Sequence, residues 1–385
     1  MKRMLLTVAA LALHGVCLMA QIWGRTETPL VDGRDVTFKL NAPKAEEVKV
    51  YGDFLPGVDG FGLGGNAAMV KGEDGVWTYT AKNLTPDFYF YYFDVDGVKT
   101  LDPSNLKVVH NFAEHLNSFV IQGAESRLVD FASDKKGSLT QQWYYSSVIG
   151  CERRMNVYLP YGYSADKEYD VFYLQHGGGD DEETWVDMGR VCQILDNMIA
   201  EGLCKPMIVV LPNSFDNQMA AMNLVSPIPG TKAIVDDRGD LASERMRKGG
   251  MYTDDFVQCI IPFVESHFAV KRGRNHRAIS GLSMGGGITL YMMEKYPELA
   301  SYWCVMGSGL WDSMDGDTVV VPLKKTGYDL LWVGCGSTDM TRPEADRLVE
   351  SLRKNQMPYV FYDSQDGHNW RSWRRNLIDI LPRLF

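Results

Sequence analysis

The chain has 385 residues, of which 45% are hydrophobic and 23% charged, and it has a formal net charge of −10 with an isoelectric point near 5.3. This composition is typical of a globular protein that is long enough for two or three domains and a sizeable core. Proteins that bind nucleic acid neutralise phosphates with clustered lysine and arginine, and this acidic chain has no basic block. We therefore expect no nucleic-acid partner.

Residues 1–20, MKRMLLTVAALALHGVCLMA, combine Lys2 and Arg3 with a short apolar stretch and small residues that end at Ala20. The stretch is too short to cross a bilayer about 30 Å thick as a helix. We predict a signal peptide and a soluble exported protein, periplasmic or secreted. A lipid anchor at Cys17 is the less favoured alternative, and no membrane span is expected elsewhere.

Six cysteines follow the predicted signal peptide, and their wide spacing includes no C-x-x-C pair. The spacing therefore predicts neither a zinc site nor a redox motif. We expect mostly buried free thiols, and a disulfide such as Cys192 with Cys204 is left open.

Residues 21–125 contain short alternating runs separated by Gly, Pro, Asn and Asp, among them DVTFKLN, GVWTYTA and DFYFYYFDV. Alternation with frequent turns is typical of a β-sandwich, so we predict an immunoglobulin-like domain. The polar residues that follow predict a linker over 126–142.

From 143 to 385, strand-like apolar runs alternate with helical stretches. The strand-like runs include YDVFYLQ, PMIVVLP, HRAISGL, YWCVMGS and YDLLWVG. Such alternation predicts an α/β fold, with a mainly parallel sheet, helices on both faces and functional groups at the carboxyl ends of the strands.

Ser283 stands in the sequence Gly-Leu-Ser-Met-Gly at residues 281–285, between a strand-like run and a helical one. This G-x-S-x-G pattern is typical of a strained strand-to-helix turn that exposes a nucleophilic serine, with glycines that let the two elements pack closely. A bare five-residue match also occurs by chance. The assignment of Ser283 as the nucleophile therefore depends on its partners.

A serine hydroxyl needs a base to remove its proton and a carboxylate to orient that base. His368 lies beyond the last strand-like run, after the serine, in the chain order of an α/β-hydrolase. Asp339 follows the run LLWVGCGST between them and is the favoured acid. Asp363 and Asp366, closer to His368 in sequence, remain alternatives.

The run HGGG at 176–179 follows an early strand, where glycines allow backbone N–H groups to approach a substrate oxygen. We predict an oxyanion hole formed by the N–H groups of Met284 and Gly178. Gly177 is an alternative donor or a substrate contact.

Residues 143–385 resemble the esterase D group of α/β-hydrolases, specifically the feruloyl and acetyl-xylan esterases of carbohydrate esterase family one. The resemblance rests on ERRMNVYLPYGY, YLQHGGGDDEETW, GLSMGGG, VGCGSTD and DGHNWRSWRRNL. It implies Ser283 as nucleophile, His368 as base and Asp339 as acid, with no metal or cofactor. Trp185 and Trp370 match aromatic positions of the group and are candidate substrate contacts, although large tryptophans more often serve the core.

The first domain resembles early-set immunoglobulin-like modules related to carbohydrate-binding module family forty-eight. VKVYGDF, DGVWTYTAKNL, FYFYYFDVDG and LDPSN show the likeness. It implies a structural or substrate-positioning module, in which Tyr89, Tyr91 and Tyr92 either pack in the sandwich or stack on sugars.

Together these resemblances imply a secreted serine esterase that removes feruloyl groups from plant cell-wall xylan, with feruloylated or acetylated xylan or xylo-oligosaccharide as its substrate. An acetyl-xylan esterase and a siderophore esterase of the enterochelin type are alternatives. A catalytically silent glycan-binding protein is the alternative from another class. Oligomeric state is not predicted.

Overall fold

The computed structural model describes residues 28–57, 64–111, 114–221, 224, 250–312 and 314–385. The predicted signal peptide and Cys17 lie outside these residues. The described residues form two compact units. One extends to Val108 and includes Leu116–Gln122, and the other runs from Gly123 to Phe385 and includes residues 109–111 and 114–115.

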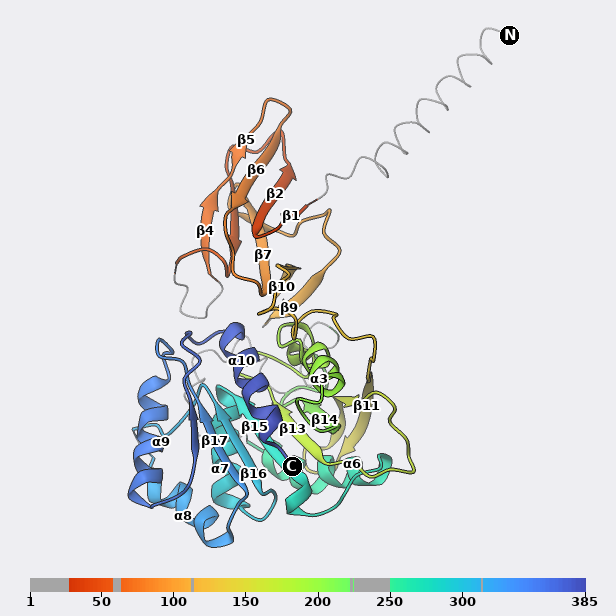
Figure 1. The fold of residues 1–385 in the computed structure, drawn as a ribbon, viewed down its shortest axis with the longest axis vertical. Coiled ribbons are helices and arrows are strands. Elements are labelled where there is room, and N and C mark those ends of the chain that lie inside the picture. Colours follow the sequence, from red (N-terminus) through yellow and green to blue (C-terminus); the bar gives the residue numbers. More distant parts are fainter. Residues whose placement is uncertain (1–27, 58–63, 112–113, 222–223, 225–249, 313) are drawn as a thin grey trace, which may run out of the picture. The chain divides into compact units, whose positions relative to one another are not determined.

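The first unit is β-rich, as predicted, and contains two sheets (Figure 1). Their strand orders are β1-β2-β6-β5 and β4-β3-β7-β10-β9, and β8 pairs with β7. The strands are β1 (Leu30–Asp32), β2 (Asp35–Asn41), β3 (Val48–Gly52), β4 (Gly65–Ala68), β5 (Val70–Lys71), β6 (Val76–Ala81), β7 (Phe88–Val95), β8 (Val98–Thr100), β9 (Val108–Asn111) and β10 (Glu114–Val120). Residues 109–111 of β9 and 114–115 of β10 pair in the second of these sheets but group with the second unit.

Alternation along the strands builds the core of this unit. In β2 every second side chain is buried, including Phe38, whose ring centroid lies 4.7 Å from that of Tyr91 in an edge contact. Tyr89 and Tyr91 are both buried in this core, while Tyr92 stacks on Tyr51 at 4.8 Å. Tyr89 and Tyr91 therefore serve the packing of the first unit.

The second unit is built on an eight-stranded sheet in the order β11-β12-β14-β13-β15-β16-β17-β18. The first two pairings in this order are antiparallel and the others are parallel, which confirms the predicted mainly parallel α/β sheet. The strands are β11 (Ser138–Ser146), β12 (Cys151–Leu159), β13 (Val171–Gln175), β14 (Ile208–Pro212), β15 (Arg277–Leu282), β16 (Tyr302–Met306), β17 (Leu330–Gly334) and β18 (Val360–Tyr362).

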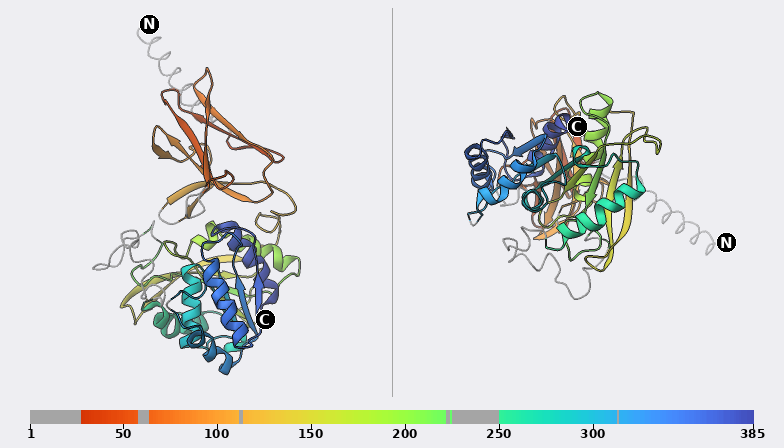
Figure 2. Two further views of the ribbon diagram at one scale, coloured as in Figure 1. Left: turned by 90° about the vertical axis from the view of Figure 1, so that its left-hand side faces the viewer. Right: turned by 90° about the horizontal axis from the view of Figure 1, so that it is seen from below.

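Helices cover both faces of this sheet (Figures 1 and 2). One hydrophobic core joins the sheet to helices α6, α7, α8 and α9, while α3 and α10 bury their apolar residues outside that core, on the other face. The helical elements are α2 (Thr184–Asp187), α3 (Val191–Ala200), α5 (Tyr252–Asp255), η2 (Phe256–Ile260), α6 (Ile261–His267), η3 (Arg274–His276), α7 (Met284–Lys295), α8 (Gly316–Thr326), α9 (Arg342–Lys354), α10 (Trp370–Ile380) and η4 (Leu381–Arg383).

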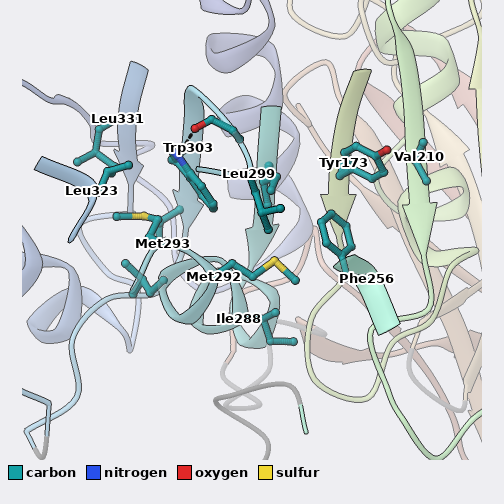
Figure 3. Packing of buried hydrophobic residues seen from close by; sticks show 14 of the residues in the cluster. Tyr173, Val210, Phe256, Ile288, Met292, Met293, Leu299, Trp303, Leu323 and Leu331 are labelled. Carbon is teal, nitrogen blue, oxygen red and sulfur yellow. Dashed lines mark hydrogen bonds between the residues drawn. The ribbon is translucent and has the colours of Figure 1, made fainter. Parts of the chain in front are cut away.

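The core between the sheet and α7 fixes the helix that follows Ser283. Met292 and Met293 of α7 pack near Trp303 of β16, whose Nε1–H donates to the carbonyl of Ala300 at 3.0 Å (Figure 3). All three side chains are fully buried. Close packing of this kind holds α7, and with it the turn at its start, rigidly against the sheet.

Two sequence predictions need correction or completion. The linker predicted over 126–142 is wrong, because residues from 123 onward belong to the second unit and Ser138–Ser146 pair with β12 as the edge strand β11. The polar residues are explained by that edge position, since much of β11 is exposed. Cys192 and Cys204, the pair left open for a disulfide, are free thiols.

Among the helices of the described ranges, none has the length and apolar character needed to cross a membrane.

Candidate active site

Ser283 occupies a strained turn between strand and helix. Strand β15 ends at Leu282 and α7 begins at Met284, and the intervening serine has φ 51° and ψ −114°. A non-glycine residue rarely adopts positive φ, and such strain clusters at functional sites. Ser283 therefore lies in the strained strand-to-helix turn that the G-x-S-x-G pattern predicts.

The glycines on either side of the turn are explained by close backbone approach. A Cβ on Gly281 would lie 2.4 Å from the carbonyl carbon of Gly285, and a Cβ on Gly285 would lie 2.5 Å from the carbonyl oxygen of His176. Both obstacles are backbone atoms that cannot move aside. The helix can approach the strands of the sheet only because these positions lack side chains.

We expect Gly281→Ala to lower the free energy of unfolding by about 3 kcal/mol, since the added methyl group overpacks a rigid turn. Urea denaturation followed by circular dichroism measures this loss. The matched control is Gly72→Ala, where the added Cβ would meet an exposed side-chain atom of Asp74, and where we expect a change below about 1 kcal/mol. Equal stability of Gly281→Ala and the unmodified chain would contradict the packing argument.

The structure brings Ser283, His368 and Asp339 together. His368 Nε2 lies 2.9 Å from Ser283 Oγ, and His368 Nδ1 lies 2.8 Å from Asp339 Oδ1. A carboxylate only accepts, so Nδ1 bears the proton and Nε2 is left to accept the serine hydroxyl proton. This is the geometry that a nucleophile, a base and an orienting acid require.

Asp339 is held as an ionised carboxylate. Its Oδ1 also accepts hydrogen bonds from the backbone N–H and the hydroxyl of Thr341, each at 2.8 Å. Burial works to raise the pKa of Asp339, but the hydrogen bond and charge of His368, together with Thr341, outweigh it and lower that pKa. The two alternative acids are engaged elsewhere, Asp363 with Arg342 and Asp366 with Arg375.

The glycine loop at 177–179 lies beside the serine. A Cβ on Gly177 would come 3.6 Å from Ser283 Cβ, and Gly178 next to it is half-buried. His176 anchors the loop, because its Nε2 accepts the backbone N–H of Ser214 at 2.8 Å and its Nδ1–H donates to the Gly177 carbonyl at 2.8 Å. Burial lowers the pKa of His176 to about 4, so this side chain is a neutral hydrogen-bonding anchor at physiological pH.

Trp185 and Trp370 do not face a substrate surface, which corrects their prediction as substrate contacts. Their exposed fractions are 1% and 4%, and their rings contact each other edge to face at 5.3 Å. Trp185 Nε1–H donates to the carbonyl of Gln175. We assign both side chains to the packing that supports the site.

His110 is buried and lies in the range predicted as the β-domain, yet its hydrogen-bond partners belong to the unit that contains Ser283. Its Nε2 lies 3.0 Å from both carboxylate oxygens of Asp181, and its Nδ1 lies 3.1 Å from Asp187 Oδ2. Burial works against the charged ring, but these two carboxylates outweigh it and raise the pKa of His110 to about 10. This contact could not be predicted from the sequence, because no motif or spacing relates His110 to carboxylates 71 and 77 residues later in the chain.

The raised pKa of His110 predicts a stability that depends on pH. A group with a raised folded-state pKa stabilises fully below its unfolded pKa of 6.5, and that contribution is lost as pH rises through about 10. We expect the urea midpoint of the protein to fall between pH 7 and pH 10 more steeply than that of His110→Gln. Parallel pH dependences in the two proteins would contradict a charged His110.

Comparison with known proteins gives the family. Residues 146–384 match the family described as "Putative esterase". The chain belongs to this esterase family. The esterase is 29% identical over 374 residues to the endo-1,4-beta-xylanase/feruloyl esterase of Xylanibacter ruminicola, a match that covers 93% of the esterase and 46% of that relative. It thus spans about half the length of this curated relative.

Solved structures agree with the predicted α/β-hydrolase fold of the esterase. A ferulic acid esterase from Anaeromyces mucronatus, in complex with ferulic acid, aligns with TM-score 0.55 and 22% identity over 69% of the esterase and 96% of that chain. The enterobactin esterase from Shigella flexneri, in the presence of enterobactin, aligns with TM-score 0.60 and 14% identity over 91% and 92% of the two chains. The family match and the solved structures thus place the chain in an esterase family with the α/β-hydrolase fold.

Proposed function

We propose that this esterase is an exported serine hydrolase that cleaves hydroxycinnamoyl esters, foremost feruloyl esters, on xylan. The observation that supports the chemistry is the hydrogen-bonded series from Ser283 through His368 to Asp339. The substrate class is supported by a relative whose name includes feruloyl esterase and which aligns with 93% of the chain. Export is proposed from the signal-like residues 1–20.

In the acylation step Ser283 Oγ attacks the ester carbonyl carbon while its proton passes to His368 Nε2. The carbonyl oxygen becomes an oxyanion, for which we propose the backbone N–H of Met284 and one N–H of the glycine loop, Gly178 or Gly177, as donors. Asp339 stabilises the imidazolium through Nδ1–H. His368 then gives its proton to the departing sugar oxygen as the C–O bond breaks.

In the deacylation step water replaces the sugar. His368 Nε2 takes a proton from the water as its oxygen attacks the acyl carbon, and the second oxyanion is held by the same N–H donors. Return of the proton from His368 to Ser283 Oγ releases the free acid and restores the site. Every proton transfer in the cycle uses Nε2, the nitrogen that faces Ser283 in this structure.

The function is tested by incubating the purified chain with feruloylated, p-coumaroylated and acetylated xylo-oligosaccharides and measuring the released acids by liquid chromatography. We expect release of ferulate and p-coumarate. Release of acetate alone would replace the proposal by xylan deacetylation, and silence on all three esters would contradict it.

A siderophore esterase is the second candidate, because the enterobactin esterase structure aligns with 91% of the chain. The sequence identity is 14%, so this likeness is one of fold. The same assay with enterobactin as substrate separates the two candidates. Appearance of its dihydroxybenzoylserine products without ferulate release would favour the second.

A further inference from the structure

We propose that His110 and Asn111, at the end of β9, are positioning residues of the esterase site, the first for the glycine loop and the second for the segment that contains His368. Both residues group with the compact unit that contains the triad. The hydrogen-bond partners that place them there belong to α2, to α10 and to the loop before α2, not to the triad. The inference rests on the proposed function, since it assigns these residues a task in ester hydrolysis.

His110 connects the two ends of the segment between Asp181 and Asp187. Its Nε2 faces both oxygens of Asp181 at 3.0 Å, while its Nδ1 and its backbone N–H both face Asp187 Oδ2 at 3.1 Å. The side chains of His110 and Asp181 are 4% and 0% exposed. A buried histidine with a carboxylate at each ring nitrogen donates from both nitrogens, so it fixes both carboxylates at once.

This fixation reaches the proposed oxyanion hole through a short, buried loop. Asp181 lies four residues after Gly177, where an added Cβ would lie 2.5 Å from Leu282 Cδ1 and 3.6 Å from Ser283 Cβ, so the glycine loop lies against the turn that contains the serine. Asp181 also accepts the backbone N–H of Glu183 at 2.9 Å, which shapes the turn before α2. A shift of Asp181 therefore re-aims the N–H groups of the glycine loop, and a misplacement of about 1 Å is enough to cost about 10² in rate.

Asn111 acts on the other side of the site. Its Oδ1 accepts the Nε1–H of Trp370 at 2.8 Å, and Trp370 begins α10 two residues after His368. The Trp370 ring contacts Trp185 at 5.3 Å and Trp373 at 5.0 Å, and Trp373 contacts the His368 ring at 5.1 Å, all with nearly perpendicular planes. Through these contacts Asn111 fixes the orientation of the Trp370 and Trp373 rings, and with them that of the His368 ring.

The first test compares His110→Gln with His115→Gln, the same substitution at an exposed histidine of the neighbouring strand β10. We expect His110→Gln to lower kcat on methyl ferulate by about 10²-fold, with KM within about threefold, because the glycine loop acts on the oxyanion of the transition state and not on the bound ester. His115→Gln should keep the unmodified kcat. An unchanged kcat in His110→Gln, or a loss confined to KM, would overturn the assignment.

Asp187→Asn decides the matter if His110→Gln fails to fold, as judged by circular dichroism and gel filtration. This carboxylate is 34% exposed, and its loss leaves the buried His110 ring paired with Asp181. We expect a kcat about tenfold lower with KM unchanged, since the clamp that Asp181 and Asp187 form on His110 loses one of its two carboxylate charges. Full activity of this variant would overturn the role of the clamp.

The second test is a double-mutant cycle on the Asn111 hydrogen bond. Asn111→Ala and Trp370→Phe remove its acceptor and its donor, and we expect each to lower kcat by about tenfold and the double variant by no more than either alone. Additive losses, or none, would overturn this part of the inference. An unmodified chain that releases no acid from any ester would instead refute the proposed function, so the two failures are distinguishable.

Discussion

Replacement of Ser283 by alanine should lower kcat for release of ferulate by about 10⁶-fold, the scale of losing the nucleophile of a serine triad. The reason is that Ser283 Oγ lies 2.9 Å from His368 Nε2, and no other hydroxyl of the described residues forms a hydrogen bond with that nitrogen. The variant still has the substrate-binding surface and the proposed backbone N–H donors of the oxyanion hole, so its residual rate should exceed that of uncatalysed hydrolysis in water. The residual kcat is obtained from steady-state release of ferulate, measured over hours at high enzyme concentration.

Ser280→Ala is the matched control for this substitution. Ser280 lies three residues earlier in β15, and its buried hydroxyl has no hydrogen-bond partner among the described residues. Loss of this hydroxyl should leave both kcat and the free energy of unfolding nearly unchanged. If Ser283→Ala keeps more than about a hundredth of the activity, Ser283 is not the nucleophile, because loss of the nucleophile of a serine triad costs about 10⁶ in kcat.

The hydrolase fold could be predicted because its signals are local. Buried parallel strands appear as continuous apolar runs, and the runs at β13, β14, β15, β16 and β17 were each identifiable before the structure. The three residues proposed as the triad are also indicated by local sequence features. Ser283 lies between glycines that the close approach of strand and helix demands, and His368 and Asp339 each follow a strand in the expected order.

The rest depends on contacts that sequence spacing does not encode. The first part of the edge strand β11, up to residue 142, falls in the predicted linker because its exposed face is polar and its pairing with β12 is not visible in one segment alone. Trp370 is a predicted substrate contact because it matches an aromatic position of the resembled esterases. An aromatic residue there suits the core or the substrate surface, and only its burial decides between these roles. His110 and Asn111 meet their partners across intervals of 71 to 259 residues.

The second large loss of kcat is expected from substitution of Asp339, the proposed orienting acid. Asp339→Ala should lower kcat by about 10⁴-fold, the scale of losing the carboxylate of a serine triad. Without Asp339 the Nδ1–H of His368 loses its acceptor at 2.8 Å, and the imidazolium formed during acylation loses its buried counter-charge. Asp363→Asn is the control, because Asp363 pairs with Arg342 away from His368 and should be dispensable for turnover.

Asp339→Asn should be less damaging than Asp339→Ala, for a reason specific to this site. Oδ1 accepts the three hydrogen bonds that the described residues donate to the Asp339 carboxylate, two from Thr341 and one from His368, while Oδ2 has no partner among those residues. The amide oxygen is therefore expected at the Oδ1 position, where it still accepts the Nδ1–H and preserves the tautomer that leaves Nε2 free to accept. Only the negative charge is lost. Equal losses of kcat in the two variants would mean that the amide turns its NH₂ toward His368, and would contradict the pairing of all three donors with Oδ1.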